Sequence, residues 1–132
     1  MRISQSLLDD LIAHARAEAP NECVGVVTGR DGSARRVIRA TNAAASPLRY
    51  ELDPRELLRI HEAIEASGDE LAAIYHSHTR SEPVPSQTDI NLAFYPETLY
   101  VIVGLRSDAP EVRAWRIVDG QVTEAALELE EG

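Results

Sequence analysis

The sequence predicts an α/β (α+β) fold in which helices flank a mixed β-sheet. The chain has 132 residues, which is the common size for one domain and enough for a real core. Its hydrophobic fraction of 44% and charged fraction of 27% are those of an ordinary globular protein. Helix-like and strand-like segments follow one another in the order α-β-β-(β)-α-β-α-β-β-β, which is typical of helices packed on a mixed sheet. We therefore expect a single domain over residues 1–132.

Two long helices and one short helix are predicted from the spacing of apolar residues and from start and stop signals. They cover residues 4–19, 54 to about 67, and 86 to about 95. The first has Ser4 or Ser6 as its N-cap. The second has Asp53 at the N-cap, Pro54 at the first helical position and Glu56 three residues past the cap. Each long helix therefore has a defined start and an apolar face that can pack on a sheet.

Strand-like runs fill the chain between these helices. They lie at residues 22–30, 34–42, 50–52, 71–78 and 99–106, and on both sides of a turn within 111–129. The run LAAIYHSH at 71–78 is mostly apolar, which suits the middle of a sheet. The turn is Asp119-Gly120, the strongest short hairpin signal.

Charge and composition exclude several functions. The net charge is −9 and the isoelectric point is near 4.8, so we expect neither a nucleic-acid partner nor binding to anionic membranes. We interpret the acidic end at 128–131 as a solubilising tail. Cys23 is the single cysteine, which excludes an intrachain disulfide and favours a reducing compartment. The start of the chain does not look like a signal peptide, and no apolar stretch has the roughly 18 residues that span a bilayer. We therefore expect a cytoplasmic protein.

Two histidines stand at the end of the apolar run. Side chains alternate along a strand, so His76 and His78 project from one face, about 7 Å apart along the backbone. Two imidazoles at this spacing can share a metal ion, since each nitrogen ligand lies about 2.0–2.1 Å from zinc. A bare His-x-His is, however, more often a pair of surface histidines at a strand end.

Three further residues complete a candidate site. Ser86 and Asp89 read as an N-cap and a first-turn acid of a helix, but Asp89 can also turn its carboxylate toward the histidines. Two histidines and one carboxylate leave the fourth position of a catalytic zinc for water, whose pKa falls to about 7. Glu22, at a helix–strand junction, is either an exposed charge or a proton carrier facing a cleft, and Ser86 is a candidate donor to an oxyanion.

The combined pattern resembles a known family. His76-Ser77-His78, then Ser86 and Asp89 at the spacing seen here, together with the upstream NECVGVVTG, is similar to the signature of the JAMM or MPN+ zinc metalloproteases. The resemblance covers essentially the whole chain. It implies a fold like that of cytidine deaminases, with Zn²⁺ and a water held by His76, His78 and Asp89. It also implies that Glu22 carries the proton from this water to the leaving amine, and that Ser86 stabilises the tetrahedral oxyanion.

A closer similarity is to the Mec-type peptidases of this family from actinobacteria, which release cysteine from the ubiquitin-like sulfur carrier CysO. Residues 37–54, 74–90 and 116–124 carry it, although Val24 stands where many such sequences have cysteine. The implied partner is a small ubiquitin-like sulfur carrier with a Gly-Gly tail, from which cysteine or a short extension is released. Two alternatives remain: an isopeptidase that removes a ubiquitin-like modifier from proteins, and a non-catalytic scaffold of the same fold.

The other conspicuous side chains favour structural roles. We expect Cys23 to be a buried structural thiol, and His14 and His61 to be solvated on their helices. Trp115 is expected in the core or on the sheet surface rather than as a substrate platform. Tyr50 and its short strand are candidates for pairing with an extended substrate tail.

Overall fold

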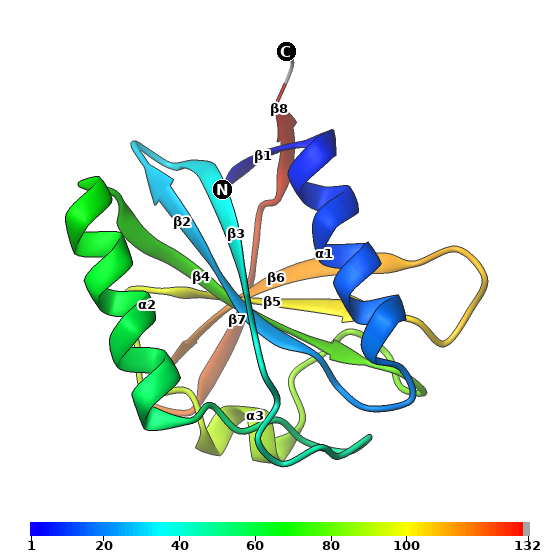
Figure 1. The fold of residues 1–132 in the computed structure, drawn as a ribbon. Coiled ribbons are helices and arrows are strands. Elements are labelled where there is room, and N and C mark those ends of the chain that lie inside the picture. Colours follow the sequence, from blue (N-terminus) through cyan, green and yellow to red (C-terminus); the bar gives the residue numbers. More distant parts are fainter. Residues whose placement is uncertain (131–132) are drawn as a thin grey trace.

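A mixed sheet of eight strands runs through the computed structural model, which describes residues 1–130 (Figure 1). The strands lie in the order β7-β6-β5-β4-β2-β3-β1-β8. Their bounds are β1 Arg2–Ser4, β2 Val24–Arg30, β3 Ser33–Ala40, β4 Glu70–His78, β5 Leu99–Gly104, β6 Glu111–Val118, β7 Gln121–Ala125 and β8 Glu128–Glu130. The helices are α1 Gln5–Glu18, α2 Pro54–Ser67 and α3 Gln87–Asn91.

The sheet is mixed because its central strand has one parallel and one antiparallel neighbour. β4 pairs parallel with β5 and antiparallel with β2. In the second pairing Val24 lies opposite His76, so the beginning of β2 meets the end of β4. The segment that precedes β2 is thereby brought beside the two histidines.

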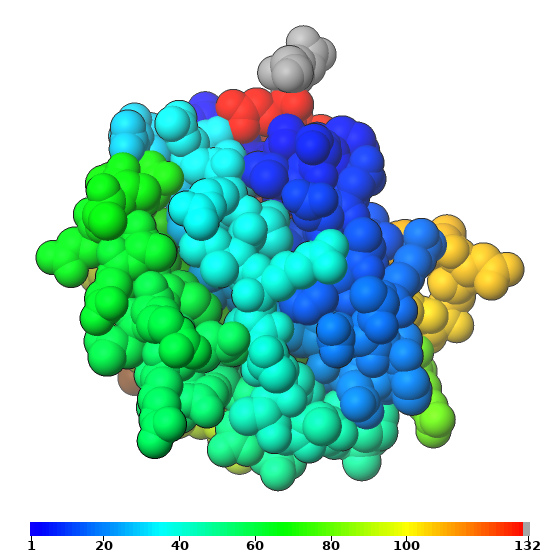
Figure 2. Space-filling view, in the orientation of Figure 1, coloured from blue at the N-terminus to red at the C-terminus, as the bar shows by residue number. Residues whose placement is uncertain are grey.

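Alternation along the central strands divides the core into two halves. Tyr75 and Val101 belong to the half that packs against α1, whereas Ile74 and Tyr100 belong to the half that packs against α2. The two long helices therefore cover opposite faces of the sheet. β3 reaches the surface between them (Figure 2).

Most predicted helices and strands are confirmed, with their start signals. The Ser4 hydroxyl accepts from the amide of Leu7 at 3.2 Å, and the Asp53 carboxylate accepts from the amide of Arg55 at 2.8 Å. Both residues of the Asp119-Gly120 turn have positive φ, 50° and 76°, as a tight two-residue hairpin requires. The mixed α+β fold class is confirmed.

Three predictions about elements are wrong or incomplete. Residues 50–52 form no strand; only an isolated bridge joins Asn42 and Leu52, so the substrate-pairing role suggested for a strand at Tyr50 loses its basis. The short helix ends at Asn91 rather than near residue 95. Two three-residue strands, β1 and β8, were not predicted, and β8 takes up part of the acidic tail. Such short strands carry too few residues for an alternating pattern to emerge.

Within residues 1–130, no helix is both long and apolar enough to cross a lipid bilayer.

Candidate metal centre

Three side chains converge where β4 ends and α3 begins. Nε2 of His76 and Nε2 of His78 lie 3.3 Å apart, and Oδ2 of Asp89 lies 3.1 Å from the first and 2.9 Å from the second. All three residues are buried. The expectation that the histidines share one face of the strand, and that Asp89 turns toward them, is therefore met.

The spacing of these three atoms fits a metal ion of tetrahedral preference. Ligand atoms that lie 2.0–2.1 Å from zinc at tetrahedral angles are about 3.3 Å apart, close to the distances between these three. Two imidazole nitrogens and one carboxylate oxygen are also a donor set that zinc accepts in catalytic sites. The site can hold a metal ion and leave one position open.

Neighbouring groups hold the two imidazole rings in place. Nδ1 of His78 donates to the carbonyl oxygen of Glu82 at 2.7 Å, which leaves Nε2 of that ring available as a ligand. The ring of His76 lies against that of Tyr50, with centroids 4.6 Å apart. Burial lowers the pKa of His76 against the opposing effect of Asp89. Burial also acts to lower the pKa of His78, but hydrogen bonds to Asp89 and Glu82 outweigh it and raise that pKa.

Asp89 serves the helix and the site at once. Its amide donates to the Ser86 hydroxyl at 3.1 Å, and its Oδ2 accepts from the Ser86 amide at 2.9 Å, which forms a reciprocal cap. Burial alone would raise the pKa of Asp89, but hydrogen bonds from His76 and His78 hold it well below its usual range. Asp89 can therefore cap the helix and also face the two histidines, because both roles require its carboxylate to be ionised.

Glu22 is a buried carboxyl, not an exposed charge at a helix–strand junction. Its side chain is only 3% exposed, and Oε1 has no hydrogen-bond partner among residues 1–130. Burial raises the pKa of Glu22 to about 8; His78 opposes this shift and Asp89 adds to it. A carboxyl with a pKa near the working pH is suited to taking up and releasing a proton.

The backbone around Glu22 is fixed by groups that sequence reasoning missed. The Asn42 side-chain amide donates to the carbonyl oxygens of Glu22 and Arg49, each at 3.0 Å, and its oxygen accepts from two further loop amides. The Ser77 hydroxyl, on the face of β4 opposite the histidines, accepts from the amide of Cys23 at 2.8 Å. The asparagine itself was visible in the sequence, but the two carbonyl groups to which it donates lie 7 and 20 positions away.

A cleft of about 280 Å³ opens beside the converging residues. Glu22, His78 and Ser86 all line it, so the predicted proton carrier and the predicted oxyanion donor face the same space. Because the Ser86 oxygen accepts the capping bond, its hydrogen is free to be donated. The remaining lining residues are Pro47, Leu48, Thr79, Arg80 and Ser81.

The remaining side chains follow the predictions except for the two helix histidines, His14 and His61. His14 is not solvated: it is 3% exposed, and a 2.6 Å hydrogen bond joins its Nδ1 to the Tyr75 hydroxyl, because this position of α1 faces the sheet. His61 is half-buried rather than fully solvated. Cys23 is buried, and burial raises the pKa of its thiol to about 11, as expected of a structural cysteine. Trp115 is also buried, and its Nε1 donates to the Pro83 carbonyl oxygen at 2.9 Å.

Comparison with known proteins agrees with this geometry. Residues 4–118 match the model for prokaryotic homologs of the JAB domain. The chain belongs to this family. The resemblance to JAMM proteins found in the sequence is therefore confirmed.

Relatives in the JAB family include named peptidases. The CysO-cysteine peptidase of Mycobacterium tuberculosis is 43% identical over 132 residues, covering 98% of this chain and 90% of that protein. The desampylase of Haloferax volcanii is 46% identical over 102 residues, covering 71% of this chain and 73% of the relative. A probable TtuB-protein conjugate cleaving protease of Thermus thermophilus is 40% identical over 120 residues, covering 90% and 77%.

Solved structures share the JAB-family fold. A protein of Desulfitobacterium hafniense is 31% identical with a TM-score of 0.88, covering 99% of this chain and 93% of that one. A JAB1/MPN domain protein of Archaeoglobus fulgidus is 21% identical with a TM-score of 0.67, covering 99% and 100%. The second likeness supports the fold alone.

Proposed function

We propose that this protein is a zinc-dependent peptidase that hydrolyses the amide bond after the C-terminal tail of a small ubiquitin-like sulfur carrier. The tail ends in Gly-Gly, and the product released is cysteine or a short extension. The observation that carries the proposal is a buried His76–His78–Asp89 cluster beside a cleft that also contains Glu22, whose Oε1 has no hydrogen-bond partner among residues 1–130. The relative named CysO-cysteine peptidase, aligned over 98% of the chain, supports the substrate class.

His76, His78 and Asp89 hold the metal in this proposal. Zinc bound there supplies Lewis acidity, which polarises the scissile carbonyl and makes water a stronger nucleophile near neutral pH. Glu22 would act as the base: burial raises the pKa of its carboxyl to about 8, and a cation held by the three ligands would favour its ionised form.

Glu22 and Ser86 perform the proton and charge steps. Glu22 accepts a proton from the attacking water while the water oxygen bonds to the carbonyl carbon. It then gives this proton to the amide nitrogen as the C–N bond breaks. The Ser86 hydroxyl donates to the oxygen on which negative charge develops. The products are a carrier tail ending in a carboxylate and a free amine.

Isopeptide cleavage is the second candidate. It is favoured by two relatives, one named a desampylase and the other named for cleaving protein conjugates. A non-catalytic scaffold is less well supported, since all predicted ligands are present and converge.

We place the protein in a reducing compartment such as the cytoplasm, because Cys23 is its single cysteine.

The test is intact-mass spectrometry of a ubiquitin-like carrier ending in Gly-Gly-Cys, incubated with the zinc-loaded protein or with Glu22→Gln. The wild type should remove one cysteine, and the variant should do so at least about 100-fold more slowly, because it lacks the proton carrier. Metal content should be equal in the two preparations. Equal rates would refute the role of Glu22, and no cleavage by a zinc-loaded wild type would refute the substrate assignment.

A further inference from the structure

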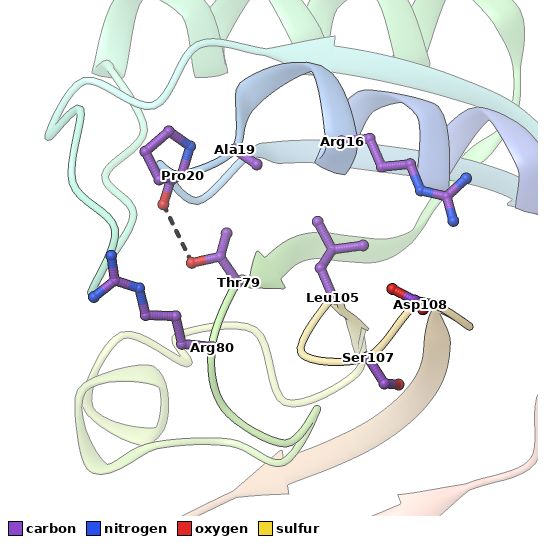
Figure 3. A pocket seen from close by; sticks show the side chains of 8 residues that line it. All are labelled: Arg16, Ala19, Pro20, Thr79, Arg80, Leu105, Ser107 and Asp108. Carbon is purple, nitrogen blue, oxygen red and sulfur yellow. Dashed lines mark hydrogen bonds between the residues drawn. The ribbon is translucent and has the colours of Figure 1, made fainter.

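Arg80 stands on a loop that is fixed at both ends beside the metal centre. The Thr79 hydroxyl donates to the Pro20 carbonyl oxygen at 3.2 Å, a bond drawn in Figure 3. Further along, the Glu82 carboxylate pairs with Arg106 at 3.1 Å. The Pro83 carbonyl accepts from the Trp115 ring. These bonds hold the backbone on both sides of Arg80, an exposed residue two positions after His78 that lines the cleft.

This arginine borders two neighbouring hollows. Arg80 and Thr79 line the cleft that contains Glu22, and they also line an adjacent pocket of about 520 Å³. Figure 3 shows Arg80 at one end of that pocket and Arg16, from α1, at the other end with Asp108. Arg80 is the cation that lines the catalytic cleft, whereas Arg16 lines the adjacent pocket alone.

The guanidinium of Arg80 forms no ion pair within the described part of the chain. Among residues 1–130 no carboxylate lies within 4 Å of its guanidinium, although arginines 30, 49, 106 and 113 are all paired with acidic side chains. Other arginines, Arg16 among them, are likewise without an ion pair among residues 1–130, so what distinguishes Arg80 is that it also lines the cleft with Glu22. A guanidinium presents a planar fork of donors that matches a carboxylate.

The product chemistry places a carboxylate in the cleft that Glu22 and Arg80 both line. When the leaving group is a C-terminal α-amino acid, its amine nitrogen must reach Glu22, and its carboxylate carbon lies only about 2.5 Å from that nitrogen. A lysine side chain in an isopeptide brings no carboxylate so close to the scissile nitrogen. A cation at the cleft can therefore favour a substrate that ends in a free α-amino acid over a lysine-linked conjugate.

We propose that Arg80 binds the free α-carboxylate of the residue after Gly-Gly, so that the enzyme prefers a terminal α-amino acid to a lysine-linked conjugate, an inference that rests on the proposed function. The site takes an amino-acid carboxylate and no cofactor. Arg80 acts here by binding the leaving residue and takes no part in proton transfer.

The experiment compares two forms of one carrier, ending in Gly-Gly-Cys with either a free carboxylate or a carboxamide. A charge-assisted pair predicts that the zinc-loaded wild type has a kcat/KM about 10- to 100-fold higher for the acid than for the amide. Arg80→Gln should cleave both forms at the rate at which the wild type cleaves the amide, and this retained rate also shows that the variant is folded. Arg80→Lys should keep part of the preference, because it keeps the charge without the fork.

Arg16→Gln is the matched control and should keep the full acid-to-amide ratio. Equal rates on acid and amide with the wild type would overturn the inference and leave the proposed peptidase standing. A ratio that survives Arg80→Gln, or one that is lost in Arg16→Gln instead, would also overturn it. Failure of the wild type to cleave either form would refute the proposed function and the inference together.

Discussion

His14 couples the protonation of one buried side chain to the stability of the core. Burial, together with the charge of Arg39, lowers the pKa of this histidine, and Glu18 opposes the shift. In the unfolded chain a histidine has an ordinary pKa of about 6.5. Below that pH the unfolded state therefore binds more protons at this position than the folded state, and the free energy of unfolding falls as the pH drops.

The substitution His14→Gln tests this coupling. Since glutamine does not titrate, the wild type should lose about 1–2 kcal/mol of unfolding free energy relative to the variant between roughly pH 7.5 and 5. Urea unfolding of both proteins at several pH values measures the difference, and the effects of the other histidines cancel in it. Stability curves that run parallel over the whole range would contradict the coupling.

At the scale of elements, the segment between β3 and α2 is shaped by one side chain rather than by regular structure. Asn42 makes four hydrogen bonds, three within this loop and one to Glu22, two residues before β2. Through the Glu22 carbonyl it fixes the backbone from which the predicted proton carrier projects. The loop therefore acts on the site in two ways, through the backbone of Glu22 and through Tyr50, whose ring lies against that of His76.

We expect Asn42→Ala to lower stability by about 1–3 kcal/mol, because several partly buried groups lose partners. The rate of tail cleavage should fall by at least tenfold while the bound metal is retained, since the ligands lie on other elements. Asn42→Asp should retain the two accepted bonds but lose both donated ones, and its rate should fall as well. Metal analysis, denaturation and cleavage rates together check this, and a normal rate in both variants would contradict it.

The packing of β2 on β4 requires glycine at position 25. A Cβ atom built there lies 2.4–2.5 Å from the ring of Tyr75, a distance at which the ring must move. Gly25→Ala should therefore lower the free energy of unfolding by about 1–3 kcal/mol, the usual range for overpacking. In a Tyr75→Leu background the same change should cost much less. A cycle of the four proteins in urea measures this coupling, and additive effects would rule out the clash.

On the scale of the whole molecule, the candidate metal ligands join the centre of the sheet to the short helix α3. His76 and His78 come from β4 and Asp89 from α3, with only a loop between them. A metal ion at this place links two elements in the folded state only, so that it stabilises the native chain by mass action.

Zinc at about 100 times its dissociation constant should stabilise the protein by about 2.7 kcal/mol and raise its thermal midpoint by roughly 10 °C. Asp89→Asn can still accept the capping bond from the Ser86 amide but removes a charged ligand, so its midpoint should rise much less. Thermal unfolding of chelator-treated protein with and without zinc gives both values. An equal rise in the wild type and the variant would show that zinc binds elsewhere.

The helices, the long strands and the residue types of the site could all be predicted from the sequence. Their signals are local: helical spacing with a cap, a continuous apolar run, a tight turn, and a His-x-His followed at fixed spacing by serine and aspartate. Each depends on residues close together in the sequence, and the pattern of the site runs only from His76 to Asp89. For this reason the pattern also indicated the family before any contact was known.

Which groups are buried, and what surrounds them, follows from the packing of distant segments and could not be predicted from the sequence. Three features depend on segments that are distant in the chain: the burial of Glu22, the burial of His14 and the hydrogen bonds of Asn42. The bond between His14 and Tyr75, for example, joins residues 61 positions apart. The short strands β1 and β8 exist because each pairs with the other across the length of the chain. The position of Arg80 between two hollows likewise depends on tethers to Pro20 and Trp115. Local spacing encodes a side chain's chemistry, but desolvation and contact arise from the packing of distant elements.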